Sequence, residues 1–155
     1  MREYALLEIF VDADACPVKD EILRVAGRHD LVVHVVSNSW MRLITGPKIH
    51  RVVVGADFDA ADDWVVEHIG NDDICVTADI ALAARCLTKG ARALGPTGKS
   101  FTNANIGMAQ AMRDLSLHLR QTGESRGLNP AFTKEARSRF LRVLESIIQE
   151  VKRNG

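Results

Sequence analysis

An apolar segment that ends in two aspartates and is followed by a proline places the strongest constraint on the fold of this chain. Residues 9–18 read Ile-Phe-Val-Asp-Ala-Asp-Ala-Cys-Pro-Val, so a single residue separates Asp12 from Asp14. The apolar part is typical of a strand buried on both faces, and Pro17 suits the first turn of a helix. We therefore predict a strand over residues 5–11 that passes into a helix, with both carboxylates at the strand's carboxyl end.

Strand-like and helix-like segments alternate along the rest of the chain. We predict strands over residues 31–36, 51–54, 74–77 and 91–94, helices over 17–28, 60–69, 80–87 and 105–120, and a last helix over about 133–152. This alternation predicts a mainly parallel sheet with helices on both faces, a three-layer α/β/α fold. The length of 155 residues suits a single domain over 1–155.

Composition narrows the class of protein. The formal net charge is +0, so any site for nucleic acid has to be a local basic patch. Cys16, Cys75 and Cys86 lack the spacing of a zinc site, and no segment is long and apolar enough to span a bilayer. We expect a cytoplasmic protein with free thiols and no membrane contact, and a homo-oligomer is possible. Cys16, near a helix start, is either a reactive thiol or a packed side chain, and packing is the commoner role.

Aspartates follow three of the predicted strands. They are Asp12 and Asp14 after the first, Asp57, Asp59, Asp62 and Asp63 after the third, and Asp79 after the fourth. The carboxyl ends of parallel strands share one edge of the sheet, which is where ligands bind in open α/β folds. Converging carboxylates repel one another, and a hard divalent cation such as Mg²⁺ or Mn²⁺ relieves that repulsion.

Not every aspartate in this set has to be functional. Helix caps and turns are the usual place for Asp, and we interpret Asp57, Asp59 and Asp63 in that way. Asp12 and Asp79 directly follow buried strands, where an unpaired charge is costly, and for these two we favour a functional role. Asp14 and Asp62 are open to either interpretation.

Candidates for binding a phosphate backbone are scattered along the chain. Arg42 and Lys48 lie near Trp40 in the segment after the second strand, although a solvated loop is the default interpretation. Arg113 lies on the predicted helix over 105–120 and is a candidate to point back to the acidic edge. Asn105, at the start of that helix, is a candidate to bind an acid or a phosphate.

Three motifs resemble the YaiI/YqxD family of bacterial proteins. They are Val-Asp-Ala-Asp-Ala-Cys-Pro-Val at residues 11–18, Phe-Asp-Ala-Ala-Asp at 58–62 and Val-Thr-Ala-Asp-Ile-Ala-Leu-Ala at 76–83, and the similarity extends through Asn105-Ile106 to Met112-Arg113-Asp114. That family looks like a branch of the PIN-like folds, many of which are Mg²⁺- or Mn²⁺-dependent nucleases. The resemblance implies a central first strand and an acidic pocket at its carboxyl end.

Residue by residue, the resemblance assigns four positions of this pocket. Asp12 matches the first PIN acid, Asp62 is the best candidate for the middle acid, and Asp79 matches the acid of the Thr-x-Asp motif. Thr77 would be the supporting hydroxyl. Many PIN nucleases have another acid where this chain has Ala81, and Asp14 is a candidate to compensate for it.

Three functions are compatible with these residues. The first is a Mg²⁺- or Mn²⁺-dependent nuclease, acting on RNA rather than DNA, in which Asp12, Asp62 and Asp79 bind metal and Asp14 assists. The second is a haloacid-dehalogenase-type phosphatase with Asp12 as nucleophile, although the acidic pair that this class needs late in the chain is missing. The third is a binding module for nucleic acid or protein with a degenerate acidic pocket, which Ala81 and the neutral net charge favour.

Overall fold

The computed structural model of the chain describes residues 7–14, 16–42, 46–55, 57, 59–122 and 132–154, and for residues 116–122 it describes the backbone alone. Its strands are β1 (Ile9–Asp12), β2 (Val33–Ser37), β3 (Ile49–Val53), β4 (Ile74–Val76), β5 (Arg92–Leu94) and β6 (Ser100–Phe101). Its helices are α1 (Lys19–His29), α2 (Ala60–His68), α3 (Ile80–Thr88), α4 (Ile106–Thr122) and α5 (Lys134–Asn154).

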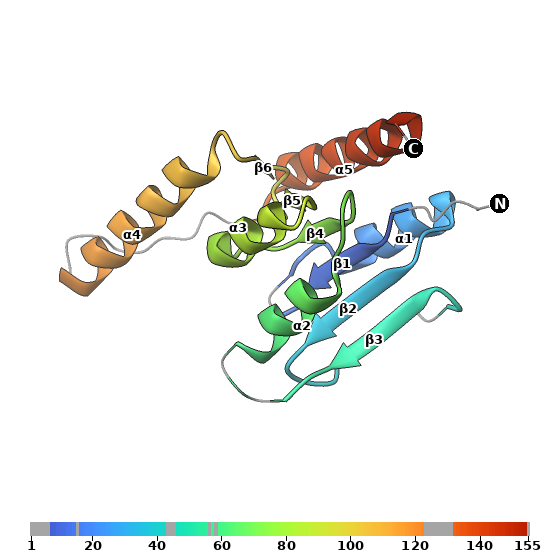
Figure 1. The fold of residues 1–155 in the computed structure, drawn as a ribbon, viewed down its shortest axis with the longest axis horizontal. Helices are drawn as coiled ribbons and strands as arrows, with labels where there is room; N and C mark the ends of the chain where they lie inside the picture. The colour runs from blue at the N-terminus through green and yellow to red at the C-terminus, as the bar shows by residue number, and fades with distance from the viewer. Residues whose placement is uncertain are drawn as a thin grey trace.

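The strands form one sheet in the order β3-β2-β1-β4-β5-β6, and β1 lies in its interior (Figure 1). Val11 of β1 is in register with Val35 of β2 on one side and Val76 of β4 on the other, both in parallel pairs. Among the strands that the structure describes, only the β5–β6 pair is antiparallel. The chain moves outward from β1 to β3 and then returns to β4, so the strand order reverses between β1 and β4, where open α/β sheets bind ligands.

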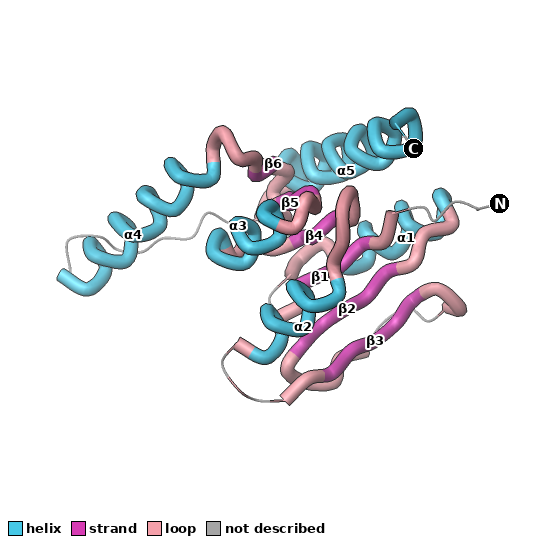
Figure 2. Tube along the Cα trace, viewed as in Figure 1, coloured by secondary structure: helices cyan, strands magenta, loops and turns pink. Residues whose placement is uncertain are grey.

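Helices cover both faces of the sheet, as Figure 2 shows, and the predicted three-layer α/β fold is confirmed. Side chains alternate along β1: Ile9 and Val11 pack into a core with α1 and α5, whereas Phe10 packs into a core with α2 and α3. A nearly continuous apolar strand is needed for this arrangement because both of its faces are buried.

Helix α5 lies antiparallel to the strands. Near its start, Arg139 Nε donates to the carbonyl of Thr97, just beyond the carboxyl end of β5, at 2.8 Å. Near its end, Glu150 pairs with Arg92 at the amino end of β5, with 3.3 Å between Oε1 and Nη1. A Cβ on Gly98, which has a φ of 96°, would lie 2.6 Å from Cγ of Arg139. Thus α5 packs directly on the turn after β5, and its first turns lie at the carboxyl edge of the sheet.

The described side chains of helix α4, those of residues 106–115, pack little of their surface against the rest of the protein. Ala109 is buried with Ala83 of α3, whereas Met108, Met112 and Leu115 are 69%, 55% and 49% exposed. In Figure 1 the helix extends away from the sheet. Its residues are therefore poorly placed to contribute to a site at the centre of the sheet.

The boundaries of several elements differ from those predicted. Helix α1 begins at Lys19, because Pro17 and Val18 form a turn that precedes it, and β1 is described from Ile9. Strand β6 was not predicted, since two residues after a Gly/Pro turn carry no periodic pattern. In the part of the chain that the structure describes, no helix is long and apolar enough to cross a membrane.

Candidate active site

Asp12 ends β1, and a buried hydroxyl fixes its orientation. Thr77, directly after β4, is 2% exposed and donates from Oγ1 to Asp12 Oδ2 at 2.7 Å. The same Oγ1 accepts the backbone N–H of Asp79 at 2.9 Å. Burial raises the pKa of the Asp12 carboxyl, the Thr77 bond lowers it, and the charges of Asp79 and Asp14 raise it further. Thr77 therefore joins the ends of the two strands on either side of the reversal in strand order.

Asp79 has a structural role in addition to any functional one. It is the N-cap of α3, and its Oδ1 accepts the backbone N–H groups of Ala81 at 2.9 Å and Leu82 at 3.3 Å. An aspartate directly before a helix commonly does this, since the first amides of a helix have no partner within it. The charge of Asp79 nevertheless raises the pKa of both Asp12 and Asp62, so the three carboxylates are close enough to repel one another.

Asp62, in the first turn of α2, has the clearest perturbation among the four predicted acids. Its pKa is raised from 3.8 to about 6, first by burial and then by the charges of Asp79, Asp12 and Asp59, and Arg85 opposes this only weakly. The half-buried carboxylate forms no ion pair with any described residue. A carboxylate kept in this position at a cost to stability is a frequent property of functional sites.

This perturbation predicts a pH-dependent effect of Asp62→Asn on stability. Because the pKa of Asp62 is higher in the folded protein, its contribution to stability is fully present below 3.8 and is lost as the pH rises through about 6. Asp62→Asn removes that loss and should raise the free energy of unfolding above pH 6 by about 1 kcal/mol, allowing for solvent screening of a partly exposed group.

Urea unfolding at several pH values measures this difference, which should vanish below pH 3.8. Asp57→Asn, in the exposed turn before α2, is the matched control and should show little change at any pH. A loss of stability in Asp62→Asn at neutral pH would show that the carboxylate makes a favourable contact instead.

Asp14 is exposed, and a residue directly after the neighbouring strand β2 restrains it. Its Oδ2 accepts the backbone N–H of Asn38 at 3.1 Å, and Asn38 Nδ2 donates to the carbonyl of Gly55 at 2.9 Å. These bonds join the segments that follow β1, β2 and β3. Asn38 was not among the predicted site residues, although a polar residue directly after a buried strand was the available signal.

A small cavity lies between the ends of β1 and β4. Its volume is about 60 Å³, and it is lined by Asp12, Asp14, Cys16, Thr77, Ala78 and Pro96. Pro96, in the turn after β5, was not predicted because that turn reaches the site only through the β4–β5 pairing. The cavity joins the acids of the first motif to the Thr-x-Asp motif.

Cys16 is buried in the wall of this cavity. Burial raises the pKa of its thiol, with weaker opposing contributions from a backbone hydrogen bond and from Lys19. The alternative of a thiol activated by a helix start is wrong, because α1 begins three residues later and desolvation dominates. The packed thiol, the role favoured from the sequence, is the one that the structure supports.

The chemistry of the donors fits a divalent cation, because the four acids offer the carboxylate oxygens that Mg²⁺ and Mn²⁺ prefer. However, no three His, Cys, Asp or Glu side chains among the described residues lie close enough together to hold a metal ion. Asp12, Asp14 and Asp79 each direct one oxygen to a protein donor. Their other oxygens accept no hydrogen bond from the described residues, and a cation would have to draw these side chains closer together.

Lys48, a predicted candidate for binding nucleic acid, does not lie beside the acids. It directly precedes β3, so it lies at the amino edge of the sheet, opposite Asp12, and its Nζ pairs with Asp30 Oδ2 at 3.0 Å.

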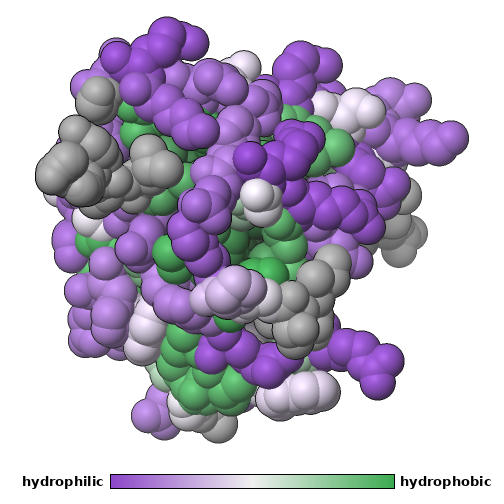
Figure 3. Space-filling view, turned by 90° about the vertical axis from the view of Figure 1, so that its right-hand side faces the viewer, coloured by the Kyte–Doolittle hydropathy of each residue, from purple (hydrophilic) through white to green (hydrophobic). Residues whose placement is uncertain are grey.

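The face at this end of the molecule is largely hydrophilic, with apolar side chains visible in a hollow between polar ones (Figure 3). A cavity of about 240 Å³ lies here, lined in part by Leu23, Leu31 and Ile49.

The other predicted supporting residues are not brought to the cavity. Asn105 holds the turn before α4: its Oδ1 accepts the N–H of Thr102 and its Nδ2 donates to the carbonyl of Ser100, both at 2.9 Å. Arg113 is exposed on α4 and lies 3.9 Å from its neighbour Asp114, so it does not reach the acidic edge in this structure. Arg42 is exposed, and the described residues give it no contact with the acids.

Comparison with known proteins gives a consistent result along almost the whole chain. Residues 10–150 match the family described as "Uncharacterized BCR, YaiI/YqxD family". A UPF0178 protein of Parvibaculum lavamentivorans is 59% identical over 148 residues, which cover 96% of this chain and 97% of that protein. UPF0178 protein R01393 of Rhizobium meliloti is 57% identical, with 94% and 99% covered. No solved structure is significantly similar to the chain. The motifs at residues 11–18, 58–62 and 76–83 all lie inside the matched range, and the chain belongs to the YaiI/YqxD family.

Proposed function

We propose that this protein is a metal-dependent phosphodiesterase that cleaves nucleic acid, RNA in preference to DNA, at the acidic cavity. The observation that carries the proposal is the convergence of Asp12, Asp62 and Asp79: the charge of Asp79 raises the pKa of both Asp12 and Asp62, and a buried threonine orients Asp12. Acids that only cap a helix or lie on the surface are not usually gathered closely enough to repel one another in this way. The resemblance to PIN-like nucleases supports the choice of RNA.

Asp12, Asp62 and Asp79 would hold the cation, which supplies the positive charge that polarises a phosphate. Thr77 restrains the Asp12 side chain through its hydrogen bond, so that the free oxygen keeps one direction. Asn38 restrains Asp14 in the same manner at the mouth of the cavity. Ala78 and Pro96 complete the wall, and they limit the space available to water around the reacting phosphate.

Asp79→Asn separates the capping role of this residue from metal binding. Asparagine caps a helix about as well as aspartate, so α3 should keep its start while the charge is lost. We expect Mn²⁺, titrated into the parent protein by calorimetry, to bind, and Asp79→Asn to bind it about tenfold to a hundredfold more weakly. Equal heats for parent and variant would contradict the assignment of Asp79 as a ligand.

A binding module without catalysis is the second candidate, and one observation favours it. Asp14 and Asp79 already have protein partners, and no three potential ligands are gathered among the described side chains. This candidate predicts that Asp12→Asn keeps or improves the affinity for RNA, and that no divalent ion supports cleavage by the parent.

A further inference from the structure

Positive charge gathers on the first turns of α5. Residues 134–142 contain four basic side chains and a single acid, in a chain whose formal net charge is +0. The basic residues are Lys134, Arg137, Arg139 and Arg142, and the acid is Glu135 in the first turn, where it suits the helix dipole. This part of α5 is therefore a local basic surface of the kind that a neutral protein needs in order to bind a polyanion.

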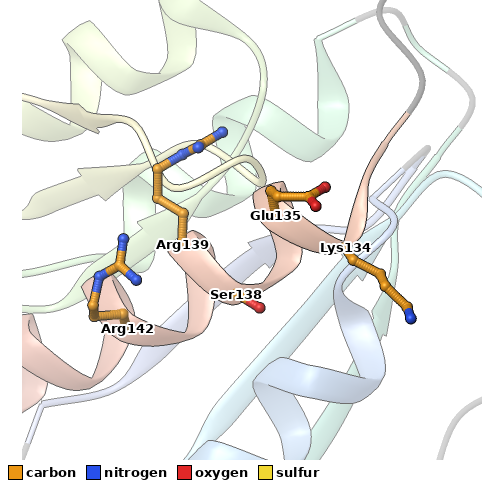
Figure 4. Close-up of a pocket in the computed structure, with 5 residues that line it drawn as sticks. All are labelled: Lys134, Glu135, Ser138, Arg139 and Arg142. Carbon is orange, nitrogen blue, oxygen red and sulfur yellow. The ribbon is translucent and has the colours of Figure 1, made fainter.

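The basic side chains line a groove of about 310 Å³, which we call the α5 groove; Lys134, Glu135, Ser138, Arg139 and Arg142 form it (Figure 4). Arg139 and Arg142 extend from the same side of the helix, and Lys134 extends from its start. Within the described part of the chain, Lys134 and Arg142 form no ion pair, in contrast to Arg137, whose Nε lies 2.9 Å from Glu21 Oε2. Arg142 therefore has a charge that no described carboxylate neutralises.

One turn separates the α5 groove from the acidic cavity. Pro96 lines the cavity, and the carbonyl of the next residue, Thr97, accepts the hydrogen bond of Arg139 Nε at 2.8 Å. Pro96 and Thr97 are adjacent, and successive Cα atoms lie about 3.8 Å apart. A single stretch of backbone therefore separates the groove from the cavity. Gly98 packs against Arg139 and Phe140 and holds this stretch on α5. The groove and the cavity are therefore neighbours at the carboxyl edge of the sheet.

A phosphodiester that approaches the acids needs cations nearby, since the carboxylates alone repel it. Lys48 lies at the opposite edge and Arg113 lies on α4, away from the sheet. The α5 groove supplies further positive charge beside the acids, and a guanidinium suits the fork of a phosphate. Lys134 and Arg142 are eight residues apart, about 12 Å along the helix, which is long enough for more than one phosphate of a polymer.

We propose that the α5 groove binds the sugar–phosphate backbone of a single-stranded nucleic acid and leads that strand over the Pro96–Thr97 turn to the acids. The last clause rests on the proposed function, whereas the binding itself does not. A single strand fits because its backbone is flexible enough to follow an open groove and then enter a cavity of about 60 Å³, which is too narrow for a duplex.

The test measures binding without cleavage. Fluorescence anisotropy of a labelled single-stranded RNA of about 12 nucleotides, titrated with the full chain in EDTA, gives the affinity. Arg142→Gln should weaken the affinity about tenfold at low salt. It should also reduce the slope of log affinity against log salt concentration by about 0.7, as expected for one lost phosphate contact. Arg142→Lys should keep the slope. Arg153→Gln is the matched control, since it removes an exposed arginine from the last turn of the same helix, at the other edge of the sheet, and it should change neither quantity.

Failure of this inference is distinguishable from failure of the proposed function. No RNA binding by the parent, equal losses in Arg142→Gln and Arg153→Gln, or an equally Arg142-dependent affinity for a duplex would overturn it. Hydrolysis of bis(4-nitrophenyl) phosphate with Mn²⁺ measures the acids, because this small ester has no second phosphate to place in the groove, and Arg153→Gln should leave that rate unchanged. RNA binding that depends on Arg142, without hydrolysis of either substrate, would support the groove and contradict the nuclease.

Discussion

Asp12→Asn should lower the rate of Mn²⁺-dependent RNA cleavage by about a thousandfold while the protein stays folded. The carboxylate lies at the reversal in strand order, where Thr77 orients it and Asp79 and Asp14 are close enough to raise its pKa. Loss of a ligand charge here removes several kcal/mol of transition-state stabilisation, which corresponds to a rate change of this size. Cleavage of an end-labelled RNA, followed on a gel with Mn²⁺ and with EDTA, measures the rate.

The control for this variant is Asp30→Asn, at the opposite edge of the sheet. Asp30 has a left-handed φ of 58°, which asparagine tolerates, and its carboxylate contacts Lys48 rather than the acids. The free energy of unfolding of Asp12→Asn should not fall, because the substitution removes a buried charge and Thr77 can still donate to the amide oxygen. Cleavage at the parent rate by Asp12→Asn would show that the activity arises elsewhere.

Phe140→Ala should lower the free energy of unfolding by about 4 kcal/mol. Phe140 is 0% exposed and belongs to the core that α5 forms with α1 and β1. Its removal leaves a cavity between α5 and the sheet, next to the point where Gly98 packs against the helix. Urea unfolding followed by far-ultraviolet circular dichroism measures the change.

Two further substitutions limit the interpretation of this result. Phe140→Leu keeps most of the apolar volume and should cost about 1 kcal/mol. Leu115→Ala, on the exposed side of α4, should have an effect within about 0.5 kcal/mol. If Phe140→Ala proved as mild as Leu115→Ala, α5 would not be part of the folded core, and the position of the α5 groove beside the acids would lose its basis.

The order and type of most elements follow from local sequence pattern. Runs of β-branched and apolar residues produced β1, β2 and β4, and Gly90, a glycine with a positive φ, follows the end of α3. Strand β6 depends on pairing with β5, in which Ser100 lies opposite Leu94 across the turn that joins the two strands. Nothing in a two-residue segment records such a pairing.

The acids were easier to predict than the cations around them. Asp12 and Asp79 follow buried strands, and the rule that parallel strands end at one edge brings them together. The same rule excludes Lys48, because a residue before a parallel strand lies at the other edge. Asn38 and Pro96 reach the site through turns whose direction depends on tertiary contacts.

The α5 groove has a similar explanation. The periodicity of residues 134–154 predicts an amphipathic helix but not its direction across the sheet. Only the contacts of Arg139 with Thr97 and of Glu150 with Arg92 establish that the basic end of α5 lies at the carboxyl edge.

The antiparallel course of α5 also determines how this protein can be attached to a solid support. Leu7, next to the amino end of β1, and Asn154, at the end of α5, both lie at the edge opposite the acids. A sensor chip or resin coupled through a tag after the last helix would therefore hold the molecule by its amino edge. The acidic cavity and the α5 groove would face the flowing solution, so that the proposed binding of oligonucleotides can be measured on immobilised protein.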